Sequence, residues 1–186
     1  LVHVHTQSTV AHCFGGPGQF MTTIENKRDK SVQTVEHGAA LLATGGAEAR
    51  TSSYGYGRST TVVTHKELDQ GLAGGNIDPQ KLSSVVMIQC VDSREKSKKN
   101  YCSRFCCIST LKHALHLKEE NPALSVYVLY RDLMAYGFFE TFYSRARQMG
   151  IVFIQYDLEN PPVVTLEDAR VVVTAVEPIL DQLVKI

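Results

Sequence analysis

The sequence of 186 residues lacks the features that would point to nucleic acids, membranes or export. Its 19 Lys and Arg balance its 19 Asp and Glu, so charge gives no reason to expect a nucleic-acid or membrane-surface partner. No apolar run reaches the roughly 18 to 20 residues of a spanning helix. The alternating start, Leu1–His5, lacks the basic and apolar regions of a signal peptide. These absences favour a cytoplasmic globular protein with no membrane span.

Several catalytic and cofactor motifs are also missing. The chain has no P-loop, no H-E-x-x-H and no Ser–His–Asp order, and we assign no catalytic residue. It has no G-x-G-x-x-G, so the usual pyrophosphate site of a dinucleotide is absent. Neither the C-x2-C knuckles of structural zinc sites nor the cysteine run of bacterial ferredoxins is present.

Cysteine is scarce, yet four of the five cysteines form a tight group. Cys90, Cys102, Cys106 and Cys107 have the spacing C-x11-C-x3-C-C. Thiolates this close together form a soft ligand set, which favours a metal or iron–sulfur centre, above all a 4Fe–4S cluster. Cys13 stands apart, and we expect it to be a small buried side chain.

Two other interpretations of the cysteines stay open. Cys90 and Cys102 could form a redox disulfide, whereas the adjacent Cys106 and Cys107 rarely bridge each other because the ring is strained. This would suit a pyridine-nucleotide disulfide oxidoreductase, although the loop from Cys90 to Cys107 contains no glycine to receive a nucleotide phosphate. The other interpretation is a zinc-stabilised interaction domain.

The cysteines lie within a predicted alternation of strands and helices, which is typical of a parallel sheet with right-handed crossovers. The expected strands are Ser84–Gln89, Ser125–Tyr130 and Ile151–Tyr156, and the expected helices are Ser103–Glu119 and Phe138–Met149. Cys90 would therefore follow a strand, and the other three cysteines would surround a helix start, where the helix dipole, Arg94 and Arg104 stabilise thiolates. His113 and His116 lie farther along this helix, where we expect a solvated or capping role.

The flanking regions are predicted to be rich in β-structure. Before residue 83 we expect strands at Leu1–Thr6, Phe20–Ile24 and Ser31–Val35, a buried strand at Ala39–Ala43, and a helix at Thr64–Leu72. Thr64 and Glu67 have the spacing of a capping box for that helix. After Pro161-Pro162 we expect antiparallel strands at Val163–Leu166, Arg170–Val176 and Leu183–Ile186.

The segments around these cysteines resemble the A-subunit family of heterodisulfide reductases, over roughly residues 35–186. The segments that carry the resemblance are VVMIQCVDSRE, YCSRFCC, ALHLKEENP, VYVLYRDLMAYGFFETFYSRARQMGIVFIQYD and ENPPVV, with HGAALLATGGAEARTSSYGYG and TTVVTHKELD upstream and VVVTAVEPIL downstream.

The resemblance implies an iron–sulfur flavoprotein with a core similar to thioredoxin reductase. Cys90, Cys102, Cys106 and Cys107 would ligate a 4Fe–4S cluster, and Ala43-Thr44-Gly45 would lie against FAD. The protein would transfer electrons between flavin and clusters as part of an oxidoreductase. Its partners would be other subunits of an anaerobic redox complex, and a homo-oligomer is also compatible with the sequence.

The expected fold class is α/β: a Rossmann-like parallel sheet with helices, flanked by β-rich portions of an FAD-binding domain. Residues 1–80 would be a partial FAD-binding domain, residues 81–160 the Rossmann-like domain with the cysteines, and residues 161–186 antiparallel strands that return towards the FAD domain. Because the chain starts without Met and shows no G-x-G-x-x-G, we expect an internal fragment that is inactive in isolation.

Overall fold

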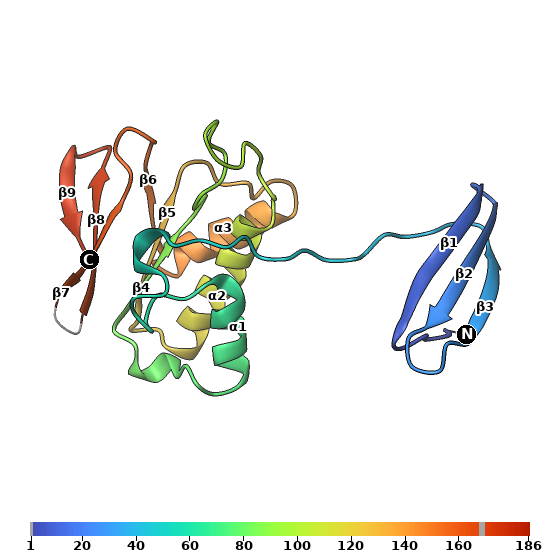
Figure 1. The fold of residues 1–186 in the computed structure, drawn as a ribbon. Helices are drawn as coiled ribbons and strands as arrows, with labels where there is room; N and C mark the ends of the chain where they lie inside the picture. Colours follow the sequence, from blue (N-terminus) through green and yellow to red (C-terminus); the bar gives the residue numbers. More distant parts are fainter. Residues whose placement is uncertain (1, 168–169) are drawn as a thin grey trace. The chain divides into compact units, whose positions relative to one another are not determined.

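The computed structural model describes residues 2–167 and 170–186, and the chain divides into two compact units (Figure 1). The first unit ends at Ala47 and the second begins at Glu48. Residues 48–80 thus pack with the later part of the chain. Their assignment to an FAD-binding domain stays a prediction.

The first unit is an antiparallel sheet of three strands, β1 (Ser8–Gly16), β2 (Gln19–Asn26) and β3 (Val32–His37). The predicted strands Phe20–Ile24 and Ser31–Val35 are confirmed, because β2 and β3 pair on either side of the turn at residues 26–30. The turn between β1 and β2 requires Gly15, because a Cβ there would lie 2.0 Å from the Gln19 carbonyl oxygen, and its φ is +102°.

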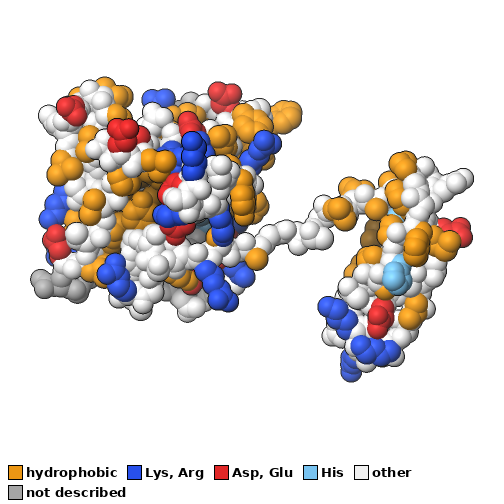
Figure 2. Space-filling model, turned by 45° about the horizontal axis from the view of Figure 1, so that its top comes forward, with side chains coloured by type: hydrophobic (Ala, Val, Ile, Leu, Met, Phe, Trp, Pro, Cys, Tyr) orange, Lys and Arg blue, Asp and Glu red, His pale blue; other side chains and the backbone are white. Residues whose placement is uncertain are grey.

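Two expectations for this first unit are wrong. No strand forms over residues 2–5, where Val2 and Val4 are largely exposed. Cys13 is exposed on β1, because a single three-stranded sheet has no second layer to cover both faces. Apolar side chains accordingly lie on the surface of this unit (Figure 2), and Val10, Phe14 and Val32 are each more than 60% exposed.

The segment from Ala39 to Arg50 has neither helix nor strand. The predicted buried strand Ala39–Ala43 is therefore wrong, and Leu41 and Leu42 are 90% and 92% exposed. A buried strand needs neighbouring strands to satisfy its backbone N–H and C=O groups, and this segment pairs with none among the described residues.

The second unit is built on a parallel sheet in the order β4 (Ser84–Ile88), β5 (Ser125–Tyr130) and β6 (Val152–Gln155). Helix α2 (Cys106–Glu120) connects β4 to β5, and α3 (Phe139–Gln148) connects β5 to β6. The predicted strand–helix alternation is confirmed, and the arrangement is compatible with a Rossmann-like part.

Helix α1 (His65–Ala73) precedes this sheet and begins at the predicted capping box. The Thr64 hydroxyl accepts a hydrogen bond from the Glu67 N–H, and the Glu67 carboxylate accepts one from the Thr64 N–H. Two short 3₁₀ turns, η1 (Ser53–Gly55) and η2 (Pro79–Lys81), flank α1. Within the described residues, none of the helices has both the length and the apolar character that a membrane crossing needs.

The chain ends in an antiparallel sheet of β7 (Val163–Glu167), β8 (Arg170–Glu177) and β9 (Gln182–Lys185), as predicted. The second unit has three layers, namely the helices, the parallel sheet and the C-terminal antiparallel sheet, with an apolar core between each neighbouring pair. Leu68, Leu111 and Ala146 of the three helices pack on one face of the parallel sheet, whereas Val173 and Ala175 of β8 pack on the other. Each fully buried aliphatic side chain contributes about 1.5 to 3 kcal/mol to such a core.

Candidate metal centre

The loop between β4 and α2 carries the four clustered cysteines. Cys90 lies two residues beyond β4, Cys102 lies in the loop, and Cys106 and Cys107 open α2. Four residues of this glycine-free loop adopt left-handed φ values between 51° and 59°: Cys90, Asp92, Arg94 and Arg104. Left-handed backbone costs a non-glycine residue roughly 1 to 2 kcal/mol, so the surrounding contacts must hold this path in place.

Each of the first two cysteines has a basic residue beside it. The Arg94 guanidinium donates to the buried Cys90 Sγ at 3.6 Å and also pairs with the Asp132 carboxylate. The backbone N–H of Arg104 donates to the half-buried Cys102 Sγ at 3.2 Å. Donors of this kind stabilise negative charge on a metal-bound sulfur atom.

The two adjacent cysteines at the start of α2 interact with each other. The Cys107 thiol hydrogen-bonds to Cys106, and this bond lowers the pKa of Cys106 and raises that of Cys107, which burial raises further. The Cys107 thiol also lies 3.8 Å from the Asp132 carbonyl oxygen, just beyond β5.

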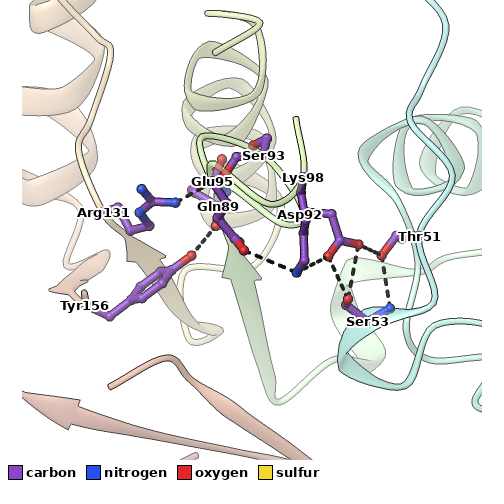
Figure 3. Close-up of polar contacts among 9 residues, drawn as sticks. All are labelled: Thr51, Ser53, Gln89, Asp92, Ser93, Glu95, Lys98, Arg131 and Tyr156. Atoms are coloured by element: carbon purple, nitrogen blue, oxygen red, sulfur yellow. Dashed lines mark hydrogen bonds and ion pairs between the residues drawn. The ribbon is translucent and has the colours of Figure 1, made fainter. Parts of the chain in front are cut away.

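Hydrogen bonds to Asp92 connect the beginning of the cysteine loop to the segment before α1 (Figure 3). Its carboxylate accepts hydrogen bonds from the Thr51 hydroxyl at 2.6 Å, the Ser53 hydroxyl at 3.0 Å and the Lys98 ammonium at 2.8 Å. These donors, Lys98 first, lower the pKa of Asp92. Residues some forty positions apart are thereby joined next to Cys90.

The carboxyl edge of the parallel sheet supports the same loop (Figure 3). The Arg131 guanidinium donates to the Ser93 and Arg94 carbonyl oxygens at 3.1 and 3.0 Å. The Tyr156 hydroxyl donates to the Gln89 carbonyl oxygen, and burial raises the pKa of Tyr156. An open cavity of about 590 Å³ lies along this edge and is lined in part by Arg131, Asp132 and Tyr156. Ligands of open parallel sheets bind at this edge.

A histidine pair, which the sequence patterns did not predict, lies between α1 and α2, with His65 half-buried and His113 buried. His65 Nδ1 lies 3.2 Å from His113 Nδ1, and Thr110 Oγ1 lies 3.1 Å from His65 Nε2. His113 Nε2 lies 3.2 Å from the Asp69 carboxylate. His113 is only 4% exposed, so the solvated role expected for it is wrong, while His116 is exposed. One feature of the sequence could have indicated a polar contact at this face of α1. His65 and Asp69 are four residues apart, a spacing that places both side chains on the same face of a helix.

The chemistry of the four thiols fits an iron–sulfur cluster. They are free rather than paired in disulfides, they follow one loop, and Arg94 and the amino end of α2 lie beside them. In the described residues, however, no three Cys, His, Asp or Glu side chains are gathered closely enough to hold a metal ion. Cluster binding therefore requires the loop to draw the sulfurs together.

The residues predicted to contact FAD lie elsewhere in the chain. Ala43, Thr44 and Gly45 are exposed in the segment without helix or strand, and Gly45 has a φ of +70°. Their role stays a prediction.

No family model matches the chain. Several individual proteins do match the chain. The chain is 36% identical to the A subunit of the ferredoxin/F(420)H(2)-dependent CoB–CoM heterodisulfide reductase of Methanosarcina acetivorans, over 74% of this chain and 19% of that protein. It is 36% identical to the iron–sulfur A subunit of the CoB–CoM heterodisulfide reductase of Methanocaldococcus jannaschii, over 72% of this chain and 22% of that protein.

A third relative gives the same result. The A subunit of the H(2):CoB–CoM heterodisulfide,ferredoxin reductase of Methanothermobacter thermautotrophicus is 39% identical over 68% of this chain and 22% of its own length. The chain spans about a fifth of the length of these curated relatives. The three matches name the same kind of subunit, and each covers at least two thirds of the chain, which therefore belongs to the A-subunit family of heterodisulfide reductases.

Proposed function

We propose that this chain transfers electrons through a 4Fe–4S cluster ligated by Cys90, Cys102, Cys106 and Cys107. It would act as part of an oxidoreductase in a heterodisulfide-reductase-like anaerobic redox complex. The observation that carries the proposal is the grouping of four free cysteines on one loop, in a chain related to a protein named for its iron–sulfur content. When bound, such a cluster accepts and releases one electron at a time.

The contribution of the protein is to place hydrogen-bond donors and positive charge beside the ligand sulfurs. Arg94 donates to Cys90, the Arg104 N–H donates to Cys102, and the amino end of α2 favours negative charge at Cys106. Burial of Cys90 and Cys107 limits the access of water to two of the four ligands. Hydrogen bonding, burial and nearby charge are the factors that set a cluster's potential.

FAD and partner subunits complete the proposal. Ala43, Thr44 and Gly45 would contact FAD in the longer protein, where an exposed segment without regular structure can follow the surface of a bound flavin. Other subunits of the redox complex would be the partners, as the names of the relatives suggest. We place this activity in the cytoplasm.

Anaerobic reconstitution with iron and sulfide tests the cluster. The chain should gain a broad absorbance near roughly 400 nm that bleaches with dithionite, with about four irons and four sulfides bound. Replacing Cys90, Cys102, Cys106 or Cys107 singly by Ser should lower the iron content and weaken the absorbance. Cys13→Ser is the matched control, because Cys13 lies on β1 in the other unit, and it should bind as much iron as the wild type.

Two other results would contradict the cluster. A colourless chain with one tightly bound zinc would favour a zinc-stabilised interaction domain. A colourless, metal-free chain that forms a reversible disulfide between Cys90 and Cys102 would favour the disulfide oxidoreductase.

A further inference from the structure

Gln89 is the one buried side chain whose polar atoms have no hydrogen-bond partner within residues 2–167 and 170–186. Its side chain is 1% exposed, and neither its Nε2 nor its Oε1 is paired. Burying an unpaired amide is unfavourable, so such a group in a folded protein calls for an explanation, such as a redox role or a bound group. Gln89 directly precedes the first clustered cysteine, Cys90.

The backbone of Gln89 is held firmly, which fixes where its side chain starts. Its N–H donates to the Leu129 carbonyl oxygen at 2.8 Å, which continues the pairing of β4 with β5. Its carbonyl oxygen accepts the Tyr156 hydroxyl (Figure 3). The carboxamide is therefore held at the carboxyl edge of the sheet.

Strand alternation places the Gln89 side chain on the helix side of the sheet. Val85 and Met87 of β4 pack in the core with the helices, whereas Val86 and Ile88 pack in the core with β8. Gln89 continues the first series because successive side chains of a strand point to opposite faces.

Cys107 lies at the same edge and on the same face. It belongs to the first turn of α2, and its thiol contacts the Asp132 carbonyl oxygen just beyond β5, the neighbour of β4. Leu111, one turn farther along α2, packs in the core that contains Met87. The Gln89 carboxamide and Cys107 thus lie on the same face of the sheet, at its carboxyl edge.

We propose that the Gln89 carboxamide donates a hydrogen bond to a sulfur atom of the cysteine-held centre and thereby raises its reduction potential. This inference rests on the proposed function. Reduction adds one electron, supplied by the reductant, and breaks no bond. The added negative charge is shared by the sulfur atoms, so an N–H donor stabilises the reduced state more than the oxidised state. Gln89 would be a positioning and tuning residue.

The test is a redox titration of the reconstituted chain, monitored by the EPR signal of the reduced cluster, with Gln89→Met as the variant. Met has a similar volume and no N–H donor, so the cluster should still form while its potential falls. We expect the ratio of reduced to oxidised cluster at the wild-type midpoint to drop about tenfold, which corresponds to about 59 mV for one electron.

The control and a second measurement keep the test decisive. Gln155→Met changes an exposed glutamine at the same sheet edge, whose amide donates to the Arg131 carbonyl oxygen at 2.9 Å, and its midpoint should match the wild type. Urea unfolding of the metal-free chains should show that Gln89→Met is at least as stable as the wild type, because it removes an unpaired buried amide.

The outcomes separate the two proposals. A wild-type chain that binds no cluster overturns both. A cluster with the same midpoint in the wild type and in Gln89→Met overturns the role of Gln89 alone. If Gln89→Met binds no cluster and its metal-free form is less stable than the wild type, the carboxamide has a structural partner and the inference is also wrong.

Discussion

At the scale of single residues, the histidine pair between α1 and α2 has a consequence for stability. Burial, together with the neighbouring His113 and against the opposing effect of Glu48, lowers the pKa of His65 to about 4. One consistent assignment keeps both rings neutral: the Thr110 hydroxyl donates to His65, His65 donates to His113, and His113 donates to Asp69. Protonating His65 would break this chain.

The stability of the chain should therefore fall in mild acid. The folded-state pKa of His65 lies below its ordinary value of 6.5, so its stabilising effect is complete above pH 6.5 and is lost as the pH falls towards 4. The loss at pH 4 should be on the order of 2 to 3 kcal/mol in the free energy of unfolding. Urea unfolding between pH 7 and pH 4 measures it.

A matched pair of variants isolates this effect. His65→Gln should flatten the fall in stability with pH, whereas His116→Gln, at an exposed position on α2, should leave it unchanged. Parallel pH profiles for the wild type and His65→Gln would show that another group causes the fall.

The histidines also show what a single sequence hides at this scale. The helical spacing of His113 and His116 predicts only that they lie on the same helix, not which of the two faces α1. Burial of a polar ring depends on the partner across the contact, and His65 lies 48 positions away from His113 in the sequence. The pairing of two distant helices is thus invisible to local patterns.

At the scale of elements, Asp92 joins the cysteine loop to the segment before α1. Asp92→Ala would remove its hydrogen bonds from Thr51, Ser53 and Lys98. We expect a loss of about 1 to 3 kcal/mol in the free energy of unfolding, because hydrogen bonds to a charged group are among the stronger ones. Urea unfolding of the metal-free chain measures the loss, and reconstitution should also yield less bound iron.

A control variant is needed because Asp92→Ala changes stability in two ways: it removes hydrogen bonds, and it places Ala in a strained backbone conformation. Asp92 and Asp181 have nearly the same left-handed φ, 51° and 50°, and Asp181 lies in the exposed turn between β8 and β9. Asp181→Ala should therefore lower the free energy of unfolding only by the strain of placing Ala in this left-handed conformation. Equal losses in the two variants would mean that the contacts of Asp92 do not hold the loop.

The elements were predicted well where local chemistry decides them. β5 runs from Ser125 to Tyr130 as predicted, because its alternating apolar residues end at turn-forming neighbours. Helix α2 begins at Cys106 rather than Ser103, because Arg104 takes a left-handed φ and breaks the first predicted turn. The grouping of the cysteines was visible in their spacing, but the loop path that separates their sulfurs depends on the distant contacts of Asp92 and Arg131.

At the scale of the whole molecule, the two units have different roles in the proposal. The second unit, from Glu48 onwards, holds every clustered cysteine, and the first unit holds only Cys13. The segment between β3 and α1 includes the residues proposed to contact FAD. The apolar run Ala39–Ala43 was wrongly predicted as a strand because hydrophobicity alone cannot tell a core strand from a segment that other parts of a longer protein contact.

This segment should be the first place where a protease cuts the chain. Thermolysin cleaves before large apolar residues, and Leu41 and Leu42 are about nine-tenths exposed in backbone without helix or strand. Limited digestion followed by mass spectrometry should yield a stable product that begins at Leu41 or Leu42. Changing both leucines to Asp should slow this cut, whereas changing Leu180, exposed in the turn between β8 and β9, should not.

The same digestion decides whether Ala43, Thr44 and Gly45 face FAD. A flavin held against these residues would cover the neighbouring leucines, so FAD added in excess should slow the cut at Leu41 and Leu42, while FMN, which lacks the adenylate half, should protect less. FAD must dissociate before the protease can reach the bound segment. The cleavage rate should therefore fall as the FAD concentration rises. A cleavage rate independent of FAD would contradict the assignment of this segment, and it would leave the cysteine site, in the other unit, unaffected.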